Sequence, residues 1–199
     1  PVRRFQWWGW LSTIGGYVSG NGYVWPFNPG WQLHLNTPGT QDMARLNAFI
    51  KSVAWFQLVP SGLDGMKNLI TAGGGTLDGA DYVAAAATPT GSLLVAYVPP
   101  DHVGSITVDL TAMGGTSQAR WFDPTSGAYT DAGTGLANTG PQSFTPPGTN
   151  SAGQYDWVLV LQVATRFDFN ADGKSDILWR HTNGTNYVWH IDGSTINGG

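Results

Sequence analysis

Acidic and amide side chains near the C-terminus have the spacing of a calcium-binding loop. Residues 168–176 read DFNADGKSD, with an Asp or Asn at every second position from 168 to 172 and a further Asp at 176. Oxygen ligands at alternate positions of a coiled loop converge on one point, and Ca²⁺ prefers hard oxygen ligands. The spacing therefore predicts a Ca²⁺ site. Its expected ligands are Asp168, Asn170, Asp172, the backbone carbonyl of Lys174, and Asp176.

This loop differs from an EF-hand. An EF-hand needs an acidic side chain at the twelfth loop position, which here is Trp179, and it follows a helix that the residues before Asp168 do not predict. The pattern favours a β-type calcium loop, and the alternative is an Asn- and Asp-rich turn that holds no metal.

Tryptophan is the second residue type that could do chemistry, because the ring face buries the CH groups of a sugar. Trp7, Trp8 and Trp10 lie on an apolar helical segment, so they are predicted to pack in a core. Trp25 and Trp31 flank a strand end and a loop rich in Pro and Gly, where a substrate-binding role is as well supported as a core role.

The composition excludes several classes of protein. The chain has 199 residues, no Cys, and thirteen acidic residues that are all Asp. No disulfide, zinc–thiolate site or Cys nucleophile is therefore available, and no Glu can act as a general acid or base. The net charge of −4 argues against a nucleic-acid partner. No run of eighteen apolar residues occurs, so no membrane span is predicted. The low charge and high Gly, Thr and Asn content favour a secreted, extracellular protein cut from a longer precursor.

The periodicity divides the chain into three segments. Residues 1–60 predict a buried helix from Arg3 to about Ile14, a strand at 23–27, and a second helix capped by Thr40. Residues 61–164 predict about seven short strands separated by turns, the pattern of an antiparallel sandwich. The strands include 82–87, 92–98, 106–110, 119–123, 127–130 and 156–163, and Pro124 and Gly127 predict a turn at 123–127. Residues 165–199 predict a hairpin at 176–180 and 186–190, which is too small to form its own core.

Three sets of motifs resemble known families. Val24-Trp25-Pro26-Phe27 and Leu58-Val59-Pro60 resemble the end of the (β/α)₈ barrel in apiosidase-like glycoside hydrolases. Arg120-Trp121-Phe122-Asp123-Pro124 and Asp156-Trp157-Val158-Leu159 resemble the C-terminal β-sandwich of that family, a type labelled collagen-binding. Residues 167–196 resemble one FG-GAP/VCBS repeat, the blade unit of a calcium-binding propeller. Together the resemblances cover nearly the whole chain.

The resemblance implies a mainly β fold: an antiparallel β-sandwich (61–164), preceded by the last β/α elements of a (β/α)₈ barrel (1–60) and followed by a propeller-type blade fragment (165–199). In this family the catalytic carboxylates lie on earlier barrel strands, and no residue of this chain matches them. The implied function is therefore that of a non-catalytic C-terminal part of a secreted bacterial glycoside hydrolase that acts on plant-type or other polysaccharide.

Two alternatives remain open. The sandwich and the blade could form an adhesion module whose partner is a glycan or an extracellular matrix protein such as collagen, or they could form a structural spacer. On the first hypothesis, residues 1–60 expose barrel-facing apolar surface, and proteolysis is expected to trim the chain to about residue 65 and leave the sandwich intact.

Overall fold

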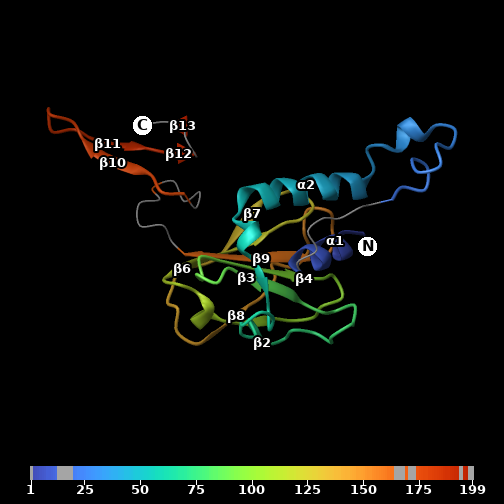
Figure 1. Ribbon diagram of the computed structural model, residues 1–199, viewed down its shortest axis with the longest axis horizontal. Helices are drawn as coiled ribbons and strands as arrows, with labels where there is room; N and C mark the ends of the chain where they lie inside the picture. The colour runs from blue at the N-terminus through green and yellow to red at the C-terminus, as the bar shows by residue number, and fades with distance from the viewer. Residues whose placement is uncertain (1, 13–19, 164–168, 170–173, 193–194, 197–199) are drawn as a thin grey trace.

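The computed structural model describes residues 2–12, 20–163, 169, 174–192 and 195–196. Their centre is a pair of antiparallel sheets. The larger sheet has the strand order β1-β3-β4-β9-β6-β7, and the smaller sheet has the order β2-β5-β8. Figure 1 shows the two helices above the larger sheet and the smaller sheet below it, so the arrangement is a sandwich with a helical layer on one side.

The strands of the larger sheet are β1 (Val59–Pro60), β3 (Ala84–Ala87), β4 (Leu93–Val98), β6 (Ser117–Phe122), β7 (Tyr129–Leu136) and β9 (Trp157–Val163). Those of the smaller sheet are β2 (Ile70–Ala72), β5 (Ile106–Asp109) and β8 (Pro141–Phe144).

Both faces of the central strands of the larger sheet are buried. Along β4, Leu94, Ala96 and Val98 pack between the two sheets, whereas Leu93, Val95 and Tyr97 pack beneath the helices. Side chains alternate between the faces of a strand, so a strand covered on both faces must be apolar at every position. This requirement explains the unbroken apolar run of β4, LLVAYV, in which all six residues are buried.

The helices α1 (Val2–Leu11) and α2 (Pro38–Ser52) supply the outer layer. Trp7 lies at their centre and is almost fully buried; its ring stacks on Tyr97 of β4 with centroids 5.9 Å apart and meets Phe49 of α2 at 5.1 Å. The prediction that Trp7 packs in a core is confirmed, while Trp8 and Trp10 pack at the border of the same cluster. Neither helix is long and apolar enough to cross a membrane, a finding that holds for the residues described above.

The C-terminal segment contributes two short antiparallel pairs. β10 (Ile177–Arg180) pairs with β11 (Asn186–Trp189), which confirms the predicted hairpin, and β12 (Ile191–Asp192) pairs with β13 (Thr195–Ile196). Trp179 stacks on Tyr187 directly across the hairpin, with ring centroids 5.0 Å apart.

The predicted mainly β, antiparallel sandwich is confirmed, and two local predictions are wrong. Residues 22–27 form turns instead of a strand, because the Asn21 side chain accepts hydrogen bonds from the backbone N–H groups of Tyr23 and Val24. Helix α2 is capped by Thr37, whose hydroxyl accepts from the backbone N–H of Thr40, and Pro38 occupies the first helical turn. The barrel end and the propeller blade are not seen in the described residues, so both remain predictions.

Candidate functional site

The two tryptophans predicted to bind substrate lie in different surroundings. Trp25 is 82% exposed and lines a groove of about 320 Å³ together with Asn21, Thr37 and Thr40. Trp31 is half-buried, does not line that groove, and packs edge-on against Phe27 with ring centroids 5.3 Å apart. The structure therefore does not bring Trp25 and Trp31 together into one binding surface.

The described lining of the Trp25 groove is mainly apolar and is neutral. No ionisable side chain is found among its described lining residues. Two of its polar groups already have structural roles, because Asn21 holds the turn at 22–27 and Thr37 caps α2. Hydrolysis of a glycosidic bond requires a carboxylic acid and a carboxylate on opposite sides of that bond, and the described lining residues of this groove supply neither.

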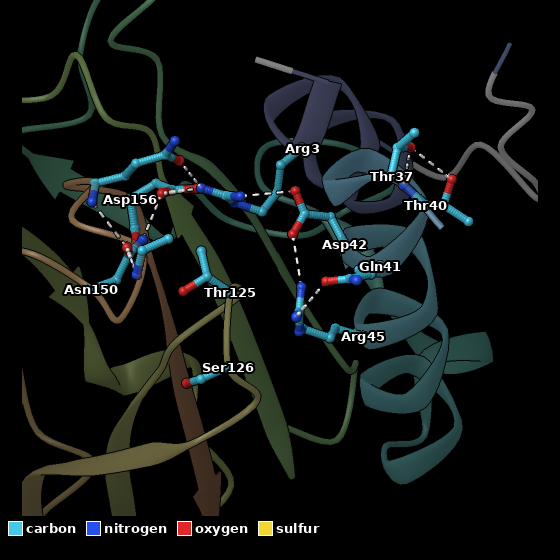
Figure 2. Close-up of polar contacts among 12 residues, drawn as sticks. Arg3, Thr37, Thr40, Gln41, Asp42, Arg45, Thr125, Ser126, Asn150 and Asp156 are labelled. Atoms are coloured by element: carbon cyan, nitrogen blue, oxygen red, sulfur yellow. Dashed lines mark hydrogen bonds and ion pairs between the residues drawn. The ribbon is translucent and has the colours of Figure 1, made fainter. Parts of the chain in front are cut away.

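The main cluster of charged side chains joins the helical layer to the sandwich. Figure 2 shows Arg3 of α1 between Asp156, which precedes β9, and Asp42 of α2. The guanidinium donates from Nε and Nη2 to the two oxygens of Asp156 at 2.6 and 2.7 Å, and from Nη1 to Asp42 Oδ2 at 2.9 Å. A further donation runs to Gln154. Arg3 and Asp156 are both almost fully buried.

Neutral donors complete the shell around Asp156. The Tyr97 hydroxyl donates to Oδ2 at 3.0 Å, and the Asn150 amide donates to Oδ1 at 2.9 Å. Burial, and secondarily the Asp156 charge, raises the pKa of Tyr97 well above its usual range. Burial disfavours the charged Arg3 guanidinium, but the hydrogen bond and charge of Asp156 outweigh it and raise the pKa of Arg3. Both side chains keep their protons at all ordinary pH values.

This cluster is a structural site. A catalytic acid must be accessible to substrate, whereas Asp156 is almost fully buried and its carboxylate is bound by Arg3, Tyr97 and Asn150. Asp42 and Asp156 share Arg3 and lie between packed layers, so they do not form the carboxylate pair of a glycosidase.

A second buried carboxylate fixes the loop that carries this cluster. Asp123, which follows β6, accepts from the Thr125 backbone N–H at 2.7 Å and hydroxyl at 2.6 Å, and from the Ser151 backbone N–H at 2.9 Å. Burial opposes ionisation, but the hydrogen bonds from Ser151 and Thr125 outweigh it and hold the pKa of Asp123 far below its usual value. The predicted turn is confirmed, with Gly127 at the positive φ of 83°.

The predicted calcium loop is described in part. Asp168, Asn170 and Asp172 lie outside the described residues. Asp176 accepts from the Phe169 backbone N–H at 2.7 Å, from His190 Nδ1 at 3.2 Å and from the Ile191 backbone N–H at 3.2 Å. Burial opposes its ionisation, but these hydrogen bonds outweigh it and lower the pKa of Asp176.

These contacts fit a closed loop, because residue 169 folds back onto residue 176. The Lys174 ammonium lies 2.6 Å from Asp192, so its charge is partly neutralised by a neighbouring carboxylate. Within the described part of the chain no group of three or more His, Asp or Glu side chains is placed to hold a metal ion. The Ca²⁺ site and its ligand set remain a prediction.

The Arg3 cluster was not predicted from the sequence. Arg3 and Asp156 are 153 positions apart, and nothing in the spacing joins them. One signal was present: Arg3 shares a helical face with Trp7 and Leu11, and a charged residue in the middle of an apolar face implies a buried partner.

Comparison with known proteins supports the sandwich and places it beside glycoside hydrolases by fold. Residues 67–162 match the model of a family described as "Putative collagen-binding domain of a collagenase". A solved structure described as a glycoside hydrolase has a TM-score of 0.66 at 22% identity and covers 82% of this chain. A glycoside hydrolase family 5 structure from Bacteroides vulgatus has a TM-score of 0.59 at 19% identity and covers 81% of this chain. No curated protein matches.

This chain matches only a part of each of these two structures. The chain spans 36% and 35% of their respective lengths. At these identities the likeness shows a shared fold, and the share of this chain that it covers is larger than the family match at 67–162.

Proposed function

We propose that this chain is a non-catalytic accessory part of a larger, secreted bacterial glycoside hydrolase that acts on plant-type or other polysaccharide. The observation that carries the proposal is the helical layer on the larger sheet. Arg3 pairs with Asp42 and Asp156 and so joins α1 and α2 to the sandwich, which gives a catalytic body a continuous surface of helices and sheet to pack against.

The segment between the two helices supports this role. Residues 20–36 contain no Asp, Glu, Lys or Arg, and five of their large apolar side chains are about half to almost fully exposed. These are Tyr23, Trp25, Phe27, Leu33 and Leu35, the last two being 88% and 50% exposed. Aromatic enrichment and a lack of charge are typical of the core of a protein interface. We therefore assign residues 20–36 to the contact with the catalytic body, which agrees with the predicted barrel-facing surface.

A mixing experiment tests this contact. The polypeptide encoded upstream of this chain and the chain itself are produced separately, and their association is measured by calorimetry and gel filtration. Leu33→Asp is expected to weaken binding by about tenfold or more, because it places a charge in an apolar interface. Val103→Asp is the matched control, since Val103 is 91% exposed but lies on the sandwich side of the chain. Failure of the two parts to associate, or an upstream region without paired acidic residues at strand ends, would refute the proposal.

A second candidate is an adhesion module for collagen or glycan. The family match over residues 67–162 favours it, because that match covers the sandwich and not the helical layer. A collagen pull-down and a glycan array on the whole chain address it directly. Retention on collagen by a chain that does not associate with the upstream polypeptide would favour this candidate over the first.

A further inference from the structure

On the helix-facing side of the larger sheet, the side chains change from apolar to polar or amphipathic beyond the end of α2. Beneath the helices this face carries apolar side chains such as Val158, Val160 and Phe122. Further along the same face the side chains are polar or amphipathic and partly exposed: Gln118 and Arg120 of β6, Tyr129 and Asp131 of β7, and Gln162 of β9. The helices leave this end of the face uncovered.

The polar side chains are ordered by contacts with one another. Arg120 donates to Gln162 Oε1 at 2.7 Å, and its guanidinium carbon lies 4.5 Å from the centre of the Tyr129 ring. Such a cation–π contact fixes the ring of a partly exposed tyrosine. Burial raises the pKa of Tyr129, so the phenol stays protonated and can donate a hydrogen bond.

A cleft of about 290 Å³ opens beside this strip, between α2 and the turn after β6. Its floor is aromatic, formed by Phe49 and Phe122 with Tyr129 at one side. Arg45 and Ser126 also line it. Figure 2 shows Arg45 on α2 and Ser126 on the turn at the two sides of this space.

Arg45 gives the cleft a positive charge, because it is the one charged side chain among the described lining residues. It donates to Asp42 Oδ1 at 3.1 Å and to Gln41 Oε1 at 3.4 Å. Asp42 gives its other oxygen to Arg3 at 2.9 Å and therefore neutralises Arg45 only in part. A guanidinium has five N–H donors in a planar fork that matches a carboxylate.

We propose that this cleft binds an acidic saccharide, with Arg45 pairing with the carboxylate of a uronic acid. The aromatic floor suits the CH face of the sugar ring. The Tyr129 phenol can donate to or accept from a sugar hydroxyl. The Ser126 hydroxyl already donates to Asp123 Oδ2 at 2.8 Å and accepts from the Ala128 backbone N–H at 3.3 Å, so it can only accept one further hydrogen bond. The site lies between α2 and the larger sheet and shares no described residue with the Trp25 groove. This proposal rests on the proposed function only because both take a glycan as the ligand, and binding at this site does not require the catalytic body.

Calorimetric titration of the whole chain with trigalacturonate, compared with neutral cellotriose, tests the proposal. Trigalacturonate is expected to bind more tightly, and its affinity is expected to fall as salt is raised, because salt screens a charge pair at the surface. Arg45→Gln is expected to weaken trigalacturonate binding by about tenfold, the effect of losing a charge-assisted pair.

Two further variants separate loss of binding at the cleft from a general effect of substitution on the fold. Lys51→Gln removes the same charge from the same helix at an exposed position that does not line the cleft, so binding is expected to be unchanged. Ala48→Trp places a large ring in the cleft from an exposed helical position and is expected to block binding while Arg45 is kept. Equal affinity for cellotriose, no binding of trigalacturonate, or retained binding in Ala48→Trp would each overturn the proposal. Loss of association with the upstream polypeptide would leave it untouched.

Discussion

At the scale of single residues, Arg3 decides whether the helical layer stays on the sheet. Its side chain is buried and pairs with two carboxylates that come from opposite layers. Removing one partner of a buried ion pair is far more costly than removing the whole pair, because the remaining charge is left without compensation.

Arg3→Met is therefore expected to lower the free energy of unfolding by about 3–5 kcal/mol, the range for breaking a buried pair. Urea denaturation followed by tryptophan fluorescence measures the change. Arg4→Met is the matched control. Arg4 pairs with Asp101, whose side chain is 53% exposed, so the expected loss is at most about 1 kcal/mol. Similar losses of unfolding free energy in both variants would show that the buried Arg3 pair stabilises the fold no more than the exposed Arg4 pair.

Asp123 makes stability depend on pH. Its folded pKa lies far below the ordinary value of 3.8, whereas the unfolded chain has the ordinary value. The stabilisation is therefore fully present above the unfolded pKa and is lost as the pH falls below it toward the folded pKa.

Asp123→Asn is expected to be less stable than the unmodified chain at neutral pH, and the gap is expected to narrow below pH ~4, where the unfolded carboxylate takes up its proton. Urea titrations across this pH range measure the gap. Asp64→Asn provides the comparison, since it removes the same charge at an exposed position. A gap for Asp123→Asn that stays constant with pH would contradict the assignment.

At the scale of elements, the C-terminal loop and hairpin form the unit that a metal ion would order. Asp176 already draws the backbone of Phe169 and Ile191 toward itself, so a loop closed by Ca²⁺ would place its ligands next to β10. Because the ligand oxygens are held in place only when the loop is ordered, part of the free energy of Ca²⁺ binding would stabilise the ordered loop and hairpin.

Titration of the folded chain with Ca²⁺ is expected to show binding, and removal of Ca²⁺ by chelator is expected to increase hydrogen exchange in β10 and β11. Asp172→Ala is expected to abolish the calorimetric signal because it removes one of the predicted oxygen ligands. Asp101→Ala, far from this loop in sequence, should leave it unchanged. A folded chain that gives no heat with Ca²⁺ would refute the site.

The elements that the sequence predicted well are those with strong local signals. The apolar runs of β4 and β9 and the Pro–Gly turn after β6 carry their own structural preferences. β1, β2 and β8 were missed, because β1 and β2 have only two and three residues and β8 is largely exposed, with no apolar run. The turn at 22–27 was mistaken for a strand, since its aromatic residues favour a strand while the bonds of Asn21 decide the backbone.

The candidate sites follow the same rule. The calcium loop is contiguous in sequence and could be predicted from spacing, although it remains untested. The Arg3 cluster and the Arg45 cleft depend on contacts between helices and strands that are remote in the chain, and no local pattern encodes such contacts.

At the scale of the whole molecule, the helical layer is a part of the core. Trp7, Phe49 and Leu46 share one cluster with Val95 and Val160 of the sheet. Removing the helices would expose this apolar face to water, which favours aggregation or partial unfolding.

A chain truncated to residues 59–199 is therefore expected to bind a hydrophobic dye and to melt at a lower temperature than the full chain. A chain ending at residue 163 is the control, and it is expected to keep the melting temperature of the sandwich. Limited proteolysis is expected to leave α1 and α2 bound to the sheet even where residues 20–36 are cut, in contrast to the trimming to about residue 65 that the sequence alone suggested. A stable, dye-free 59–199 fragment would contradict this expectation.

The order in which the layers are joined has a consequence for synthesis on the ribosome. The helices are made first, but the carboxylate that secures Arg3 is made 153 residues later and precedes the last strand of the larger sheet. Throughout translation of the sandwich, α1 and α2 therefore lack the Asp156 contact, even though Trp7 can already pack on Phe49 and, once β4 is made, on Tyr97. Contacts between such distant positions form slowly, so the nascent chain has a long vulnerable interval that ends only when β9 emerges and the two ends of the fold close on each other.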